Sequence, residues 1–97
     1  MNNEREAKMQ EPNPPFVVEI VDTQPVEVKN PFSGQKATLQ PTAVAVYDSI
    51  KGAEMLASQM GIDDGGHELW QTVRKGLDWF REHYPKEYMV ALLNSVL

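Results

Sequence analysis

Residues 67–84 read HELWQTVRKGLDWFREHY, and their apolar positions repeat with the period of an α-helix. On a wheel at 100° per residue, the large apolar groups fall within one arc of roughly 100°. These groups are Leu69, Trp70, Val73, Leu77, Phe80 and Tyr84. The opposite side alternates acidic and basic side chains, which is typical of a solvated and self-paired face. The stretch therefore predicts an amphipathic helix that buries one face against the rest of the chain.

Trp79 falls outside this arc, at about 280° on the same wheel and on the side of Gly76. In one interpretation the sheet or a third helix packs against Trp79, and Gly76 allows that element to approach closely. In the other, Trp79 is an exposed anchor for a partner, since tryptophan is enriched at the centres of protein interfaces. The sequence leaves both interpretations open.

A β-hairpin is predicted upstream of this helix. Residues 26–29 alternate apolar and charged side chains, which is typical of a half-buried strand, and residues 36–39 form the returning strand. In the turn between them, Pro31 presets φ for the first corner and Gly34 can adopt a positive φ. Residues 16–21 are rich in β-branched side chains and suit a further strand.

Two more helices complete the expected fold. A helical pattern that begins with Pro41 runs to about residue 60, and Pro85 can open a third helix that continues to the C-terminus. Apolar groups on several sides of the first helix indicate that the hairpin and another helix both cover it. Short strands with one apolar face cannot stand alone in water. We therefore predict an α+β fold, with an N-terminal antiparallel hairpin or three-stranded sheet covered by two or three α-helices.

Residues 1–15 are predicted to form a disordered arm. Their polar composition is followed by Pro12, Pro14 and Pro15, which a helix cannot pass through. Such an arm buries too little apolar surface to offset the entropy of ordering it. The remaining residues, 16–97, are expected to form one small domain.

The last ten residues, 88–97, are apolar around most of the circumference of the expected helix. A domain of this size covers only a modest fraction of its surface, so part of this helix is available for contact with another molecule. We expect Val90 and Leu97 at its exposed edge. Homo-oligomerisation is therefore a physically motivated hypothesis.

Composition excludes several functional classes. The chain has 97 residues, no cysteine and a formal net charge of −5. These values exclude a disulfide scaffold, a cysteine nucleophile and a thiolate zinc site, and they disfavour nucleic-acid binding. No apolar run reaches the roughly 20 residues that span a bilayer, and the N-terminal residues lack a secretory signal. We expect a cytoplasmic protein with neither a nucleic-acid nor a membrane partner.

The titratable side chains predict no catalytic, cofactor-binding or metal-binding site. His67 and His83 could act as bases, but about 24 Å separates them along a helix. Glu54 falls within an apolar helix face, where it either swings outward or, if buried, pairs with a base or a tyrosine hydroxyl. Asp63 and Asp64 lack the ligand spacing of an EF-hand and suit the start of the following helix. A small hydrolytic or metal-dependent enzyme that uses Glu54, His67 or His83 remains an alternative.

The tripeptide Asn30-Pro31-Phe32 matches the motif that EH domains recognise in eukaryotic trafficking proteins. Its place in a hairpin turn also gives it a structural explanation, in which Phe32 folds back on the sheet. The predicted partner-binding residues are Trp79, Val90, Leu97 and Phe32.

Several segments also occur together: NPFSG at 30–34, AVYD at 45–48, KGAE at 51–54, GLDWF at 76–80, Tyr84-Pro85 and Tyr88-Met89. Together they resemble small proteins encoded by tailed bacteriophages, a group to which we attach no activity. The resemblance covers about residues 26–93 and implies a phage product in the bacterial cytoplasm or in the virion. We therefore predict a non-enzymatic interaction module that binds and modulates a host protein, or alternatively a structural accessory of a viral particle.

Overall fold

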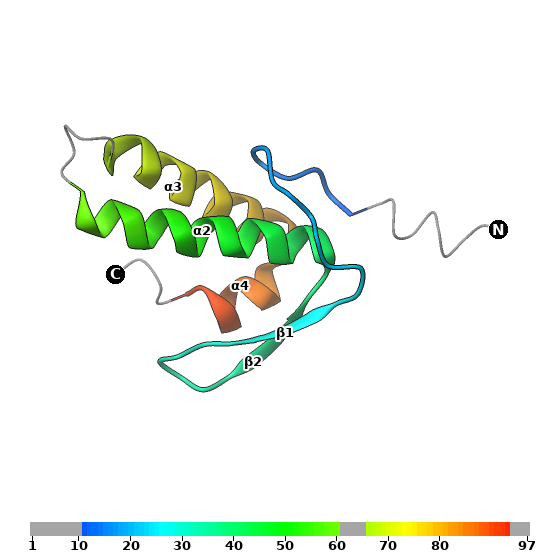
Figure 1. Ribbon diagram of the computed structural model, residues 1–97. Helices are drawn as coiled ribbons and strands as arrows, with labels where there is room; N and C mark the ends of the chain where they lie inside the picture. The colour runs from blue at the N-terminus through cyan, green and yellow to red at the C-terminus, as the bar shows by residue number, and fades with distance from the viewer. Residues whose placement is uncertain (1–10, 61–65, 94–97) are drawn as a thin grey trace.

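The computed structural model describes residues 11–60 and 66–93 (Figure 1). Within these residues, two antiparallel strands are followed by three helices, so the predicted α+β fold is confirmed. The elements are β1 (Val26–Lys29), β2 (Lys36–Leu39), α2 (Pro41–Gln59), α3 (Gly66–His83) and α4 (Pro85–Ala91).

The hairpin forms in the predicted register, with Val26 opposite Leu39 and Lys29 opposite Lys36. Asn30 closes the turn because its side-chain oxygen accepts a hydrogen bond of 2.7 Å from the backbone amide of Phe32. Gly34 adopts the expected positive φ of 78°.

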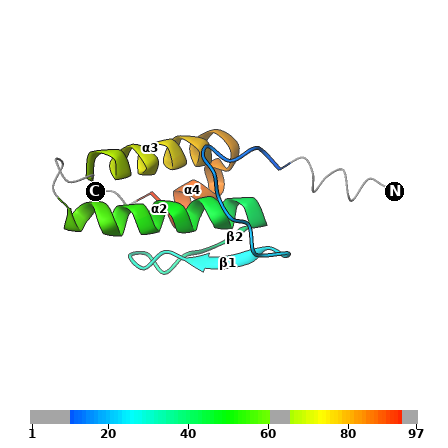
Figure 2. The ribbon, with the colours of Figure 1, turned by 45° about the horizontal axis from the view of Figure 1, so that its top comes forward.

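Two helices form the centre of the molecule, and the hairpin covers one of them. Figures 1 and 2 show α2 and α3 side by side, with α2 between α3 and the hairpin. Ile50 on α2 packs directly over Gly76 on α3, where a Cβ atom would lie 2.5 Å from Ile50 Cγ1. Ile50, Val73 and Phe80 are fully buried in this layer. The prediction that α2 is covered from two sides is therefore confirmed.

Residues 11–25, which we call the strap, run across the helices into β1 (Figure 1). The strap contains no strand, so the predicted third strand at 16–21 is wrong. Its partly buried residues Phe16 and Val18 pack against the core, while Val17 is 98% exposed. Residues 16–19 thus alternate inward and outward as in a strand, but the inward ones pack on the core instead of completing a sheet, and the alternation ends at Ile20, which is 48% exposed.

The first residues of the strap are fixed to the helices. The Glu11 carboxylate accepts a hydrogen bond of 3.2 Å from the backbone amide of Thr42, near the start of α2. The Asn13 carbonyl oxygen accepts one of 2.5 Å from the Trp79 indole. Ending the disordered arm at residue 15 is therefore wrong, because residues 11–15 pack against the domain. Residues 1–10 lie outside the described residues.

The last helix is shorter than predicted. α4 ends at Ala91 and is followed by a turn at Leu92 and Leu93, whereas the sequence predicts a helix to residue 97. Residues 94–97 lie outside the described part of the chain. Because α4 has seven residues and α3 has eighteen, α4 can cover only part of the length of α3.

Candidate functional site

Trp79 is buried, with only 5% of its surface exposed. Its ring packs edge-on against Phe80 at a centroid distance of 5.1 Å and beside Tyr84 at 5.5 Å. Its indole N–H donates a hydrogen bond to the Asn13 carbonyl oxygen. The exposed-anchor interpretation of Trp79 is therefore wrong, and the packing interpretation is correct, although the covering segment is the strap rather than the sheet or a third helix.

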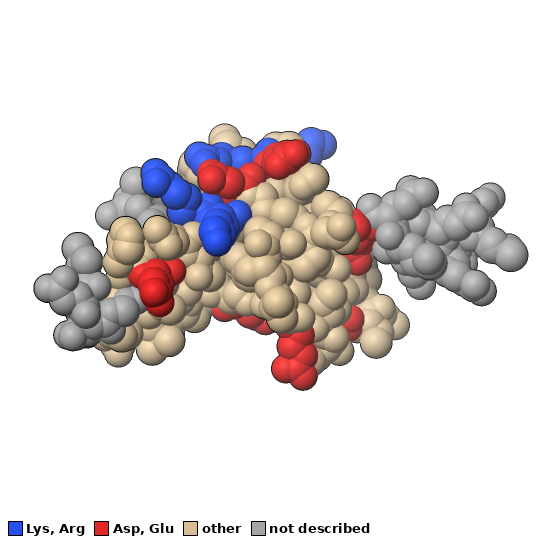
Figure 3. Space-filling view, turned by 90° about the horizontal axis from the view of Figure 1, so that it is seen from above, with Lys and Arg blue, Asp and Glu red and all other residues tan. Residues whose placement is uncertain are grey.

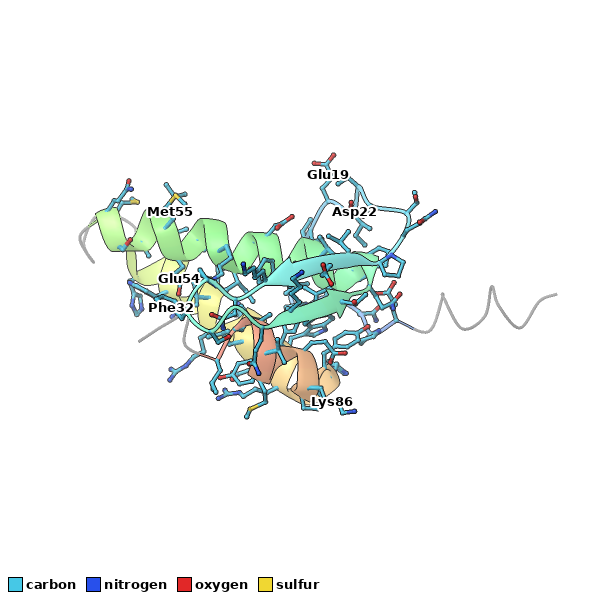
Figure 4. The ribbon with its side chains drawn as sticks, turned by 90° about the horizontal axis from the view of Figure 1, so that it is seen from below. Glu19, Asp22, Phe32, Glu54, Met55 and Lys86 are labelled. Carbon is cyan, nitrogen blue, oxygen red and sulfur yellow. The ribbon has the colours of Figure 1, made fainter. Side chains whose placement is uncertain are left out.

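The other predicted contact residues lie around the hairpin turn and the end of α4. Phe32 is 72% exposed and does not fold back on the sheet (Figure 4). Val90 is half-buried, and its carbonyl oxygen accepts a hydrogen bond of 2.9 Å from the Asn30 side-chain amide. This bond brings the turn that carries Phe32 close to Val90. Leu97 lies outside the described residues.

A cavity of about 470 Å³ opens between α3 and the end of α4. We call it the α3/α4 groove. Its lining residues are His67, Trp70, Gln71, Val73, Arg74, Leu77, Asp78, Arg81, Tyr88, Leu92 and Leu93.

The groove follows one helical stripe of α3. His67, Trp70, Arg74, Leu77 and Arg81 follow one another at spacings of three and four residues, so they lie on one face of the helix. This stripe is about 21 Å long at a rise of 1.5 Å per residue. Within the described part of the chain, the short α4 covers only part of this stripe, and Trp70 remains 37% exposed.

Two arginines, Arg74 and Arg81, lie at the rim of the groove and differ in whether they are paired with an acidic side chain. The Arg81 guanidinium forms an ion pair with Asp78 and lies 5.7 Å from the centre of the Tyr88 ring. Its hydrogen bond to Asp78 raises the pKa of Arg81, so this side chain remains cationic. Arg74, in contrast, has no ion-pair or hydrogen-bond partner among residues 11–60 and 66–93. Figure 3, a view from the α3 side, shows Lys and Arg side chains gathered there together with acidic ones.

The alternative enzyme interpretation depends on Glu54, His67 and His83, and these residues lie in different parts of the fold. The Glu54 side chain is 18% exposed on α2, and its Oε1 lies 3.6 Å from Lys51 Nζ (Figure 4). Its Oε2 is buried and has no hydrogen-bond partner among the described residues. His67 lies at the start of α3 beside Gln71, and His83 lies at the end of α3 beside Trp79. Of the two alternatives for Glu54, the structure therefore supports the one in which the side chain is largely buried and paired with a base, here Lys51, and not the one in which it swings outward into solvent.

Within the described residues, no group of three or more His, Asp or Glu side chains could hold a metal ion. Asp63 and Asp64, the candidate cation ligands or helix caps, lie outside those residues. The same part of the chain contains no helix with the length and apolar character needed to cross a membrane.

The sequence identified the side chains of the groove but not the groove itself. Trp70 and Leu77 belong to the predicted apolar arc, and Arg74 and Arg81 to the predicted solvated face. The groove lies along the boundary between the two. The groove depends on where the last helix ends. That end was not predicted, because residues 92–97 are mainly apolar and continue the helical pattern.

Comparison with known proteins returns no match, neither to a protein-family model nor to a curated protein nor to a solved structure.

Proposed function

We propose that this protein is a non-enzymatic binding module, and that the α3/α4 groove receives a segment of a protein partner. The partner segment carries two apolar side chains with a carboxylate between them.

The observation that carries this proposal is the exposure of Trp70 in the groove beside Arg74. Tryptophan and arginine are the residue types most enriched among the side chains that dominate binding energy. Arg74 has no carboxylate partner among the described residues, although the whole chain carries a net charge of −5. A partner carboxylate would supply the missing charge, while Trp70 and Leu77 would contact apolar side chains.

The spacing of the stripe limits the partner. Trp70 and Leu77 are about 10 Å apart along the helix axis, with Arg74 between them. In an extended peptide, side chains two positions apart lie on the same side, separated by about 6.6 Å. A sequence with apolar, acidic and apolar residues at alternate positions therefore matches the order of the groove.

The sequence resemblance supports a setting for this activity. In a phage product in the bacterial cytoplasm, the partner would be a host protein that the module modulates. No nucleic-acid or membrane partner is part of the proposal.

Short synthetic peptides test the groove directly. One peptide of about eight residues carries leucine, glutamate and leucine at alternate positions, and its control replaces the glutamate with lysine. We expect calorimetry to show binding of the glutamate peptide at least about tenfold tighter than that of the lysine peptide. Equal affinities, or binding that leaves the Trp70 indole resonance unchanged, would overturn the proposal.

Two variants provide the matched control. Arg74→Glu is expected to abolish the preference for the glutamate peptide. Lys75→Glu makes the same change of charge at the next position, which is exposed but does not line the groove. It should leave the affinity for both peptides within about twofold, since a charge outside the contact acts only through screened solvent.

A further inference from the structure

We propose that the α3/α4 groove receives the strap of a second copy of this chain, so that copies associate head to tail. This inference rests on the proposed function of the groove and assigns a second copy of this chain, in place of a host protein, as its occupant. Two surfaces described above carry it: the groove of one copy and residues 17–21 of the other.

The exposed side of the strap has the composition that the groove requires. Val17 is 98% exposed and Val21 is 72% exposed, and Glu19 is exposed between them. Figure 4 shows Glu19 projecting from the strap away from the helices. Among the described residues, the backbone groups of 16–22 form no hydrogen bond, so the segment is not paired with a strand of its own domain.

The two surfaces match in order and in length. Along the groove the order is Trp70, Arg74, Leu77, and along the strap it is Val17, Glu19, Val21. The groove residues span about 10 Å along the helix axis, and the valines span about 13 Å in extended backbone. Glu19 can therefore lie opposite Arg74 while both valines contact apolar side chains.

The strap cannot reach the groove of its own copy. It is fixed at Trp79 through Asn13, and Phe16 lies against Gly76. At 100° per residue, Gly76 and Trp79 lie roughly 180° around α3 from the groove stripe. The strap then leads directly into β1, which lies on the other side of α2 from α3 (Figures 1 and 2), so both of its ends are held away from the groove. Only a second copy can present this segment.

The contact joins two different surfaces, so a pair of copies retains an unused strap on one copy and an unused groove on the other. Such heterologous contacts build closed rings if the rotation closes, and open chains if it does not. A repeated contact of this kind also serves the alternative function, a structural accessory of a viral particle.

Sedimentation velocity over a range of protein concentrations tests the proposal. We expect reversible association that weakens as salt is added, because the contact includes an exposed charge pair. Glu19→Lys and Arg74→Glu should each weaken association about tenfold or more by placing like charges together. Both side chains are exposed, so unchanged melting temperatures would confirm that the variants fold.

Mixing the two variants provides the decisive measurement. The strap of the Glu19→Lys variant carries a new positive charge, and the groove of the Arg74→Glu variant carries a new negative one, so these two surfaces attract. The other two surfaces in the mixture still pair Glu19 with Arg74, and association should therefore return. Met55→Asp, an exposed apolar position outside both surfaces, is the control and should associate as the unaltered protein does.

Three results would overturn head-to-tail association: a monomer at all concentrations, association that neither charge reversal weakens, or no recovery on mixing. A monomer that nevertheless binds the leucine–glutamate peptide would reject the second copy as occupant and leave the proposed function standing. Failure of the peptide together with recovery on mixing would instead show that the groove is a subunit interface only.

Discussion

The side-chain amide of Asn30 donates a hydrogen bond of 2.9 Å to the backbone carbonyl oxygen of Val90, which lies 60 positions further along the chain. The side-chain oxygen of the same residue accepts hydrogen bonds from the amides of Phe32 and Ser33. Asn30 is only 3% exposed. One buried side chain thus holds the hairpin turn in shape and attaches it to α4.

Replacing Asn30 by alanine should lower the free energy of unfolding by about 2–4 kcal/mol, because it leaves buried polar groups without partners. Asn30→Asp retains the acceptor for the turn but loses the donor to Val90, so it separates the two functions. Urea unfolding measures both variants. A loss below about 0.5 kcal/mol for Asn30→Ala would contradict this account of the turn.

Gly76→Ala and Gly52→Ala should change stability in opposite directions. At Gly76 the new methyl group would lie 2.5 Å from Ile50 Cγ1, whereas at Gly52 no other part of the described chain approaches it within 4 Å. Overpacking should therefore cost about 1–3 kcal/mol at position 76. The better helix propensity of alanine should add up to about 1 kcal/mol at position 52. Thermal unfolding of the two variants side by side tests the packing of α2 on α3.

The two tryptophans should separate stability from binding. Trp79→Ala removes a buried ring and is expected to cost about 3–5 kcal/mol of unfolding free energy. Trp70→Ala removes a partly exposed ring of the groove, so it should affect stability far less and abolish binding of the leucine–glutamate peptide. Chemical denaturation and calorimetry on both variants provide the comparison, and the opposite assignment of effects would move the binding surface to Trp79.

Stability should fall in alkaline solution through Tyr84. Burial, followed by the nearby carboxylates of Glu11 and Glu87, raises the pKa of Tyr84 from 10.0 to about 12. The folded state therefore retains the phenolic proton at pH values where the unfolded chain loses it. This contribution is complete below pH 10 and is lost as the pH rises through about 12.

The phenylalanine variant isolates this contribution. Tyr84→Phe should unfold with a weaker dependence on pH in the alkaline range, and Glu11→Gln should lower the pKa of Tyr84 by removing one of the charges that raises it. Denaturant midpoints measured across that range, together with the tyrosinate absorbance, decide the matter. An unchanged pH dependence in Tyr84→Phe would assign the loss to other groups.

Local sequence signals predicted most elements correctly. The hairpin and the bounds of α2 and α3 were predicted to within a residue or two, because Pro41, Gly34 and the apolar arc of α3 act over a few neighbouring positions. The interpretation of residues 16–21 failed because β-branched side chains favour extended backbone but do not specify what the backbone pairs with. Here Phe16 and Val18 pack, partly buried, against the core instead.

The errors at Trp79 and at the arm have a common cause. Residues 11–15 contain little that is apolar, so their composition predicts disorder, and without them nothing in that region could cover Trp79. The indole nevertheless donates a hydrogen bond to the backbone carbonyl of Asn13. The hydrophobicity of residues 11–15 does not predict a polar interaction of this kind. The groove was missed for a similar reason, since it depends on where α4 ends and not on any one side chain.

The hydrogen bond between Trp79 and Asn13 joins residues 66 positions apart, which affects how the chain is made. At about 5–20 residues per second, a ribosome needs roughly 3–13 s to reach the tryptophan after it has passed the asparagine. Throughout that interval, the β-branched run that follows Asn13 lacks its docking site, and short runs of high β-propensity are hazards for aggregation while they are exposed. We therefore expect nascent chains stalled before residue 79 to need a chaperone more than the folded protein does.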